Sequence, residues 1–312
     1  MNTVIVGQGA IGLLCYHRLS QSKNDNKVDR LISLLPSTKT SVRQYCFSEI
    51  NGEAKNFPLI ITNNQTLACA QLIILCVKSY QVTDALKAIH SLIADDAIII
   101  VTHNGLGTFE EISHLIKPSQ SLFALLLTQG AKKTADYHIE HTGEGESNLG
   151  LIWGEPENEK KITLLKLLTQ SLKQVSFQEN IRLAQWEKLA INCVINPLSA
   201  LENINNGKIN LPIYQETVRE IIKEVVILGA REDVELDENL LLNLVMKVAE
   251  RTKQNTSSMR ADIMNKRRTE IDYINGYINR LGEKHQLDTP MNTKLWLAVK
   301  VLEKQYLLHQ TQ

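Results

Sequence analysis

The sequence predicts two domains, an α/β domain with a parallel, doubly wound sheet and an all-α domain after it. Over residues 1–130, short apolar runs alternate with segments that show the 3.6-residue period of amphipathic helices. This alternation is typical of a parallel sheet with helices on both faces. From about residue 160 onward the period is helical nearly to the end. The length of 312 residues is more than one core usually holds, which also favours two domains.

The expected elements follow from these patterns. Buried strands are predicted at residues 3–6, 30–35, 72–77, 97–101 and 122–127. Helices of the first domain are predicted at 10–21, 81–93 and 108–116, and a polar hairpin at 137–153 is expected to lead out of the sheet. Helices of the second domain are predicted at 211–230, 238–252 and 293–308. The domains are expected to comprise residues 1–175 and 176–312.

Composition and charge exclude several classes of protein. Lys+Arg and Asp+Glu each number 34, and no basic stripe is present, which argues against nucleic acid and anionic membrane as partners. No apolar run approaches the roughly 18 residues of a transmembrane span, and no basic segment precedes the first strand. The five cysteines form no CxxC pair and are expected to be reduced. We therefore expect a soluble, cytoplasmic protein.

A glycine-rich turn follows the first predicted strand. The segment VIVGQGAIG places Gly7, Gly9 and Gly12 between that strand and the first helix, as GxGxxG requires. In this context the first glycine permits the tight turn, the second lets a pyrophosphate approach the backbone, and the third allows close packing. The helix N-terminus adds free N–H groups and a positive partial charge. The turn predicts a dinucleotide site; the alternative is a strand-to-helix turn without a ligand. The residues expected to bind the cofactor here are Gly7, Gln8, Gly9, Ala10, Ile11 and Gly12.

The segment after the second predicted strand bears on the choice of cofactor. An Asp or Glu about 20 residues beyond the turn usually holds the ribose 2′-hydroxyl of NAD. Residues 31–44 contain no carboxylate, whereas Ser37, Thr38, Lys39 and Arg43 are suited to a 2′-phosphate. The segment therefore favours NADP.

Two further segments follow predicted strands. Lys78 lies at the carboxyl end of a strand, where such sheets bind ligands, and is either a second cation for the cofactor or a solvated lysine. Asn104 lies in HNGLG, which either approaches a ligand or forms an ordinary Asn-Gly turn.

The segment WEKLAINCVINP, at 186–197, carries Lys188, Asn192 and Asn196 four residues apart. On a helix these side chains form one polar stripe on an otherwise apolar surface. Asn is a poor helix former, so its repetition indicates a need for directed donors and acceptors. Pro197 is expected to kink the helix and free a carbonyl. The stripe predicts the lining of a substrate cleft; the alternative is a narrow solvated stripe.

Glu270 begins a second stripe, in which Tyr273, Ile274, Tyr277 and Ile278 follow at helical spacing. The carboxylate is therefore expected on a buried side, with a cation or a ligand hydroxyl as partner. The alternative is a glutamate near a helix start or paired with Arg267. Ser257 and Ser258 are candidates for helix caps.

A metal site is not expected. The segment HIEH has an HxxH spacing, but in a strand His138 and His141 point to opposite faces. No third ligand lies nearby in the sequence.

Five segments together resemble the ketopantoate reductase (2-dehydropantoate 2-reductase) family, in the same order over essentially the whole chain: GQGAIG, CVKSYQV, HNGLGT, WEKLAINCVINPLSAL and RRTEIDYINGYI. The resemblance implies an N-terminal Rossmann-type domain and a helical C-terminal domain like that of 6-phosphogluconate dehydrogenase, with the active site between them. It also implies NADPH-dependent reduction of 2-dehydropantoate to (R)-pantoate, in pantothenate and coenzyme A biosynthesis. A monomer or homodimer with a small-molecule substrate is expected.

The resemblance also implies roles for individual residues. Lys188 matches the family's catalytic lysine, a general acid, and Glu270 matches an active-site glutamate near the cofactor and the lysine. Ser258 matches the serine that meets the substrate carboxylate, and Asn104 an asparagine that touches both ligands. The remaining matches are to substrate-binding residues, Asn192, Asn196 and Asn206, and to a cofactor contact, Ala131.

One position departs from the family pattern. The family often has an arginine at the end of the second strand for the 2′-phosphate, and here Leu35 and Pro36 stand there. Lys39, Arg43 or Lys78 is left to hold the phosphate. Two alternatives to this function are another two-domain reductase of 2-oxo or 3-hydroxy acids, and a protein that senses NADP without turnover.

Overall fold

The computed structural model describes residues 1–22 and 30–307. The chain divides into two compact units. The first consists of Met1–His103 and Glu110–Ile181, and the second of Asn104–Phe109 and the chain from Arg182 onward. The first unit is α/β and the second is helical, which confirms the predicted fold class.

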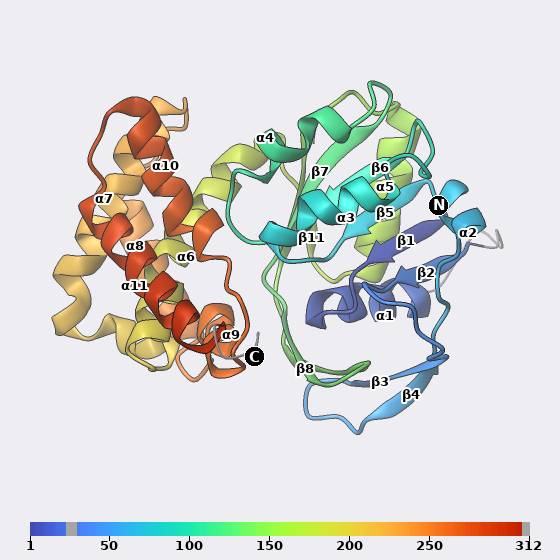
Figure 1. Ribbon diagram of the computed structural model, residues 1–312, viewed down its shortest axis with the longest axis horizontal. Helices are drawn as coiled ribbons and strands as arrows, with labels where there is room; N and C mark the ends of the chain where they lie inside the picture. Colours follow the sequence, from blue (N-terminus) through green and yellow to red (C-terminus); the bar gives the residue numbers. More distant parts are fainter. Residues whose placement is uncertain (23–29, 308–312) are drawn as a thin grey trace. The chain divides into compact units, whose positions relative to one another are not determined.

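A seven-stranded sheet forms the centre of the first unit, in the order β11-β10-β7-β6-β5-β1-β2 (Figure 1). Its strands are β1 (Thr3–Val6), β2 (Ile32–Leu35), β5 (Leu72–Leu75), β6 (Ile98–Val101), β7 (Ser121–Leu127), β10 (Ser147–Trp153) and β11 (Val175–Phe177). Five of these strands, β2, β1, β5, β6 and β7, pair in parallel and confirm the five predicted strands. The chain runs from β1 outward to β2 and then returns to β5 on the other side of β1. The carboxyl ends of β1 and β5 therefore form the switch point where such sheets bind ligands.

A second, four-stranded sheet has the order β4-β3-β9-β8. It consists of β3 (Gln44–Ser48), β4 (Lys55–Pro58), β8 (Gly130–Ala135) and β9 (His138–Gly143). The predicted hairpin at 137–153 is wrong, because β9 pairs with β8 and β3, whereas β10 pairs with β7 in the main sheet. The chain crosses between the sheets at Gly145, whose missing side chain leaves room for the backbone at Thr128 and Gln129.

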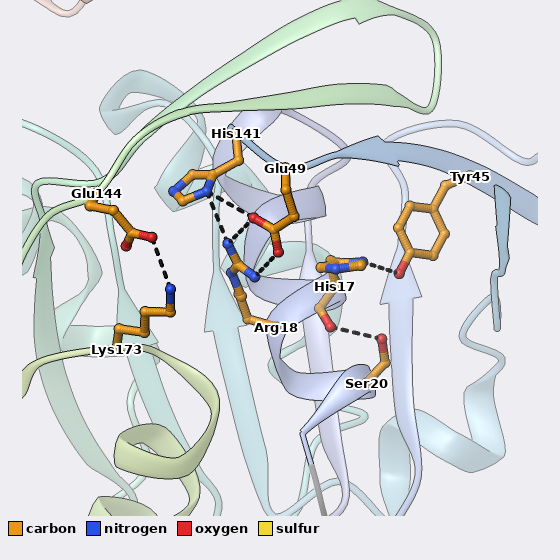
Figure 2. Close-up of polar contacts among 8 residues, drawn as sticks. All are labelled: His17, Arg18, Ser20, Tyr45, Glu49, His141, Glu144 and Lys173. Carbon is orange, nitrogen blue, oxygen red and sulfur yellow. Dashed lines mark hydrogen bonds and ion pairs between the residues drawn. The ribbon is translucent and has the colours of Figure 1, made fainter. Parts of the chain in front are cut away.

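The helices of the first unit are α1 (Ala10–Gln21), α2 (Asn64–Ala68), α3 (Val82–Ile89) and α5 (Asn158–Ser171). A fifth helix, α4 (Thr108–Ile112), begins in the second unit and ends in the first, and it continues as the 3₁₀ turn Ser113–Leu115 where the sequence predicts a single helix. Helix α1 contacts α5 and the second sheet. Figure 2 shows the contact between α1 and this sheet, where Arg18 pairs with Glu49 at 2.5 Å and His17 Nδ1 lies 2.9 Å from the Tyr45 hydroxyl.

The second unit is built around α6 (Ile181–Leu201), whose Trp186, Cys193 and Val194 are fully buried. The other helices are α7 (Gln215–Arg231), α8 (Glu238–Arg251), α9 (Ser258–Met264), α10 (Asn275–His285) and α11 (Pro290–Leu307). Helices α7, α8 and α11 confirm the three predicted helices, except that residue 308 lies outside the described residues. Across the described chain, no helix has the length and apolar character needed to span a membrane.

Candidate active site

The glycine turn has the geometry that its spacing predicts. Gly7 has φ of 106°, a conformation that disfavours side chains, and a Cβ there would lie 2.7 Å from the carbonyl oxygen of Cys76. A Cβ on Gly12 would overlap the carbonyl oxygen of Gly7, so the third glycine allows the helix to approach the turn. A Cβ on Gly9, in contrast, would meet nothing within 4 Å. The fold therefore requires glycine at positions 7 and 12, whereas Gly9 leaves open space beside the backbone.

That open space lies at the N-terminus of α1. Gly9 is the N-cap residue and supplies no side chain to the free N–H groups of the first turn. The first intrahelical bond is donated by Leu13 to the Gly9 carbonyl at 3.0 Å. Unpaired N–H groups and the helix dipole favour an anion, so this arrangement fits the pyrophosphate of a dinucleotide.

Two other predicted cofactor residues lie near the turn in the same unit. Lys78 follows β5 and precedes the 3₁₀ turn Ser79–Gln81, at the same sheet edge as the glycine turn. Ala131 lies on β8 and packs on the same apolar core as Ile11 of α1. The side chain of Gln8 donates to the Ser37 hydroxyl at 2.8 Å and accepts from the Ser37 N–H at 3.0 Å. Gln8 therefore joins the glycine turn to the loop after β2.

The predicted polar stripe lies on α6 in the second unit. Lys188 and Asn192 keep partial exposure, whereas Leu189 and Cys193 beside them are buried. Although part of the Lys188 side chain is exposed, desolvation of its ammonium group lowers its pKa to about 8, and the carboxylate of Glu270 opposes this shift. The side-chain nitrogen of Asn192 is buried and has no hydrogen-bond partner among the described residues. A buried donor without a partner costs free energy, and a ligand oxygen would remove that cost.

Asn104 and Glu270 are 166 residues apart in the sequence but hydrogen-bond within the second unit. The Asn104 side chain donates to Glu270 Oε2 at 3.1 Å, and its backbone N–H donates to Oε1 at 3.3 Å. The adjacent Leu106 N–H donates to the Tyr273 carbonyl at 2.9 Å. The segment Asn104–Phe109 therefore belongs to the same unit as the lysine helix.

Glu270 is buried as predicted, with 4% of its surface exposed, but it does not begin a continuous helix. A 3₁₀ turn at Ile271–Tyr273 follows it, and Ile274 has φ of −108° and ψ of −97°, outside the helical region. The stripe from residue 270 through residue 278 therefore crosses a break. The preceding Thr269 is held by its N–H, which donates to Glu303 Oε1 at 2.6 Å.

The remaining predicted substrate residues differ in their surroundings. Asn196 is buried on α6. Asn206 donates to the Thr252 hydroxyl at 3.0 Å, while its own side-chain oxygen is buried without a partner in the described chain. Ser257 caps α9 by accepting from the Arg260 N–H at 3.1 Å, so the exposed Ser258 is not the cap.

The sequence patterns missed a set of buried polar residues behind α6. Asn275, Asn292 and Glu224 are buried and hydrogen-bonded to one another or to backbone groups. Their only signal in the sequence is a polar residue inside an otherwise apolar helical stripe.

On β9, His138 is exposed and His141 buried, which confirms their opposite faces. No group of three potential metal ligands occurs within residues 1–22 and 30–307.

The fold and these two groups of residues define an oxidoreductase with a Rossmann-type domain followed by a helical domain. Residues 3–153 match the family described as "Ketopantoate reductase PanE/ApbA", and residues 180–303 match "Ketopantoate reductase PanE/ApbA C terminal". The chain belongs to the ketopantoate reductase family.

Curated relatives agree with this assignment over the full length. The 2-dehydropantoate 2-reductase of Vibrio cholerae serotype O1 is 30% identical over 98% of this chain and 99% of that protein. The enzyme of the same name from Shigella flexneri is 33% identical over 98% of this chain and 96% of that protein.

Two solved structures share the fold. D-Mandelate dehydrogenase, solved with NADH and anilino(oxo)acetate, is 26% identical, with a TM-score of 0.87 over 98% of this chain and 99% of that one. A PanE/ApbA family ketopantoate reductase from Ralstonia eutropha JMP134 has a TM-score of 0.83 at 21% identity, over 98% and 99% of the two chains. At that identity the second comparison shows the fold alone.

Proposed function

We propose that this protein reduces 2-dehydropantoate to (R)-pantoate with NADPH, as part of pantothenate and coenzyme A biosynthesis. The relatives from Vibrio cholerae and Shigella flexneri carry the name of this reaction. The observation that carries the proposal is Lys188, an ammonium group in desolvated surroundings on the same helix stripe as a buried, unpartnered asparagine donor. A ketone oxygen that gains negative charge during reduction needs such a donor.

Lys188 is the proposed general acid. A pKa of about 8 keeps the ammonium mostly protonated at neutral pH, yet close enough to that pH for proton transfer to be efficient. The Nζ proton moves to the carbonyl oxygen as the carbonyl carbon becomes tetrahedral, and the neutral amine regains a proton from solvent. Glu270 opposes deprotonation by its negative charge, and Asn104 holds the Glu270 carboxylate through two hydrogen bonds.

The asparagines and Ser258 are the proposed substrate-binding groups. Asn192 offers a buried N–H donor and Asn206 a buried oxygen acceptor, and neither is satisfied within the described residues. A 2-oxo acid with a hydroxyl group presents both acceptors and a donor, so it can satisfy both kinds of group. Asn196 lies on the same helix stripe, and the exposed Ser258 hydroxyl is available for the substrate carboxylate.

The glycine turn of the first unit fits a dinucleotide cofactor. Gly9 leaves open space at the uncapped start of α1, and Lys78 lies at the same sheet edge. The cofactor would supply the hydride that reaches the carbonyl carbon. The absence of a carboxylate after β2 favours NADPH over NADH, because nothing on that segment repels a 2′-phosphate.

The test is NADPH oxidation at 340 nm with 2-dehydropantoate, beside NADH and beside a small panel of 2-oxo acids. Turnover with 2-dehydropantoate and NADPH supports the proposal. Equal rates with NADH would keep the reductase and overturn the cofactor preference. Binding of NADPH without oxidation by any acid would favour a cofactor-sensing protein.

A second candidate is reduction of another branched or aromatic 2-oxo acid. It is favoured by the likeness to D-mandelate dehydrogenase at a TM-score of 0.87. Phenylglyoxylate is the 2-oxo acid that corresponds to D-mandelate, and 2-oxoisovalerate lacks the hydroxymethyl group of 2-dehydropantoate, so the panel must include both. A kcat/KM for either acid above that for 2-dehydropantoate would make this the function.

A further inference from the structure

A cavity of about 460 Å³ opens beside the glycine turn in the first unit. Four parts of that unit line it: Gln8 of the turn, residues 38–40 after β2, Val42 and Gln44 where β3 begins, and residues 136–138 where β8 turns into β9. In dinucleotide-binding sheets the segment after the second strand meets the ribose of the adenosine. The cavity therefore lies where the adenosine end of a dinucleotide would bind, while the pyrophosphate would lie at the glycine turn.

The loop after β2 is fixed against the glycine turn. Gln8 donates to the Ser37 hydroxyl at 2.8 Å and accepts from its backbone N–H at 3.0 Å. These two bonds hold the chain immediately before the cavity residues Thr38, Lys39 and Thr40. The distance between a group bound at the glycine turn and a group bound in the cavity would thus be fixed.

The opposite wall comes from the second sheet. Tyr137 has φ of 56°, a left-handed conformation that is uncommon for a large side chain, and its carbonyl accepts from the Cys46 N–H at 2.8 Å. This bond ties the β8–β9 turn to β3. The turn therefore presents Asp136 and His138 to the cavity from a defined position.

The charges of the lining distinguish a phosphate from a hydroxyl. Lys39 is exposed, and no carboxylate in the described chain forms an ion pair with it. The Asp136 carboxylate lies 2.6 Å from Lys133 Nζ, so its negative charge is opposed locally. Lys39 therefore gives the lining a cation beside two threonine hydroxyls, a combination suited to a phosphate monoester.

We propose that this cavity binds the adenosine 2′-phosphate of NADPH, with Lys39 as the cation and Thr38 and Thr40 as hydroxyl donors. This inference rests on the proposed function. It assigns the phosphate to a lysine four residues beyond the end of β2 at Leu35, where the family often has an arginine at the strand end. It also makes the β8–β9 turn part of the cofactor site. Neither Arg43 nor Lys78 is among the residues that line the cavity, so the proposal assigns the phosphate to neither of them.

The test uses two nucleotides that lack nicotinamide, so that binding is measured apart from catalysis. Adenosine 2′,5′-bisphosphate and 5′-AMP are titrated by calorimetry into the full-length protein and its variants. We expect Lys39→Ala to weaken the bisphosphate about tenfold and to leave 5′-AMP unchanged, because only the former carries the 2′-phosphate. Asp136→Asn is expected to tighten the bisphosphate severalfold, since it removes a nearby negative charge. Arg43→Ala is the matched control, and neither affinity should change.

The outcomes separate this inference from the proposed function. Equal affinity of the unaltered protein for both nucleotides, or a Lys39→Ala variant with unchanged preference, would overturn the 2′-phosphate site while dinucleotide binding stands. A loss of bisphosphate affinity in Arg43→Ala as large as in Lys39→Ala would also overturn it, because the cation would then lie elsewhere. The 2′-phosphate site would also be overturned if the protein bound NADH but showed no preference between adenosine 2′,5′-bisphosphate and 5′-AMP. If NADPH, NADH and both nucleotides all failed to bind, the proposed function itself would be overturned.

Discussion

The side-chain amide of Asn275 donates to the backbone carbonyl of Cys193 at 3.0 Å. In an unbroken helix this carbonyl would accept from the N–H of residue 197, which is proline and has none. The same amide donates to Asn292 Oδ1 at 2.9 Å, and the Asn292 amide donates to Glu224 Oε2 at 2.7 Å. Pro197 therefore frees a carbonyl inside the lysine helix, and a chain of buried amides from other helices satisfies it.

Replacement of Asn275 by leucine tests this relationship. The Cys193 carbonyl and the Asn292 amide oxygen would both lose a buried donor in Asn275→Leu. We expect the free energy of unfolding to fall by about 1–3 kcal/mol, as measured by urea denaturation. The kcat/KM of the reductase should fall as well, because the same helix carries Lys188.

A second background sharpens the test. Pro197→Ala supplies the missing N–H at position 197, so the cost of Asn275→Leu should be smaller in that background. Asn279→Leu, one turn further along α10, removes a bond to Thr293 at 3.0 Å and serves as the control. Its cost should be the same in both backgrounds. If Asn275→Leu costs the same with and without Pro197, the amide does not compensate for the proline.

The parts of the site that follow from local sequence could be predicted, and the Asn275 network could not. The glycine turn, the five parallel strands and the stripe on α6 each depend on spacing within one segment. Asn275 meets a carbonyl 82 residues away, which no periodicity records. Glu270 illustrates the same limit, because spacing alone could not reveal the break at Ile274 that separates it from α10.

The second sheet was also outside what the sequence could predict. Strand β8 is GAKKTA, with no buried residue and no apolar alternation. Its partner β9 was expected to pair with β10, because adjacent strands usually form hairpins. The pairing actually depends on β3, roughly 90 residues earlier in the chain, and on α1 beneath it.

Lys188 and Glu270 together predict the pH dependence of the reaction. The acid must be protonated, so kcat/KM should be constant below the Lys188 pKa of about 8 and fall as the pH rises through it. Because the Glu270 charge raises that pKa, Glu270→Gln should move the fall in kcat/KM to lower pH. Glu250→Gln, an exposed change in the same unit, should leave the profile in place. An unmoved profile in Glu270→Gln would remove the coupling between the two groups.

Removal of the lysine tests the general acid directly. Lys188→Ala should lose roughly 10²–10⁴-fold in kcat, the usual contribution of a positioned acid, while NADPH affinity measured by fluorescence titration stays within a factor of about two. Lys208→Ala, an exposed lysine of the same unit, is the control for charge. Near-normal turnover in Lys188→Ala would exclude this residue from proton transfer.

Gly9 and Gly12 should respond oppositely to the same substitution. Gly9 has φ of −71° and open space around a Cβ, so Gly9→Ala should fold with unchanged stability but bind NADPH at least about tenfold more weakly, because the methyl group occupies the phosphate space. A Cβ at Gly12 would overlap the Gly7 carbonyl, so Gly12→Ala should lose about 1–3 kcal/mol of stability. Thermal melts and NADPH titration of both variants separate the two roles. Full NADPH affinity in Gly9→Ala would show that no ligand approaches this backbone.

His17 predicts how the stability of the first unit depends on pH. The centroid of its ring lies 3.6 Å from that of Phe47, on which it is stacked. Desolvation, followed by the nearby Arg18 charge, lowers its pKa from 6.5 to about 4. The folded state therefore keeps His17 neutral, whereas the unfolded chain takes up a proton below pH 6.5. Stability from this group is present above pH 6.5 and is lost as the pH falls toward 4. The loss between pH 7 and pH 5 should be about 2 kcal/mol.

The comparison of variants isolates this residue from the other titrating groups. His17→Phe keeps the stacked ring but cannot be protonated, so its free energy of unfolding should fall less between pH 7 and pH 5 than that of the unaltered protein. Its stability at pH 7 should be lower, because the Tyr45 hydroxyl loses its partner at 2.9 Å. His114→Gln replaces an exposed histidine of the same unit and should keep the full pH dependence. Equal losses in all three proteins would mean that the buried imidazole does not control stability in this range.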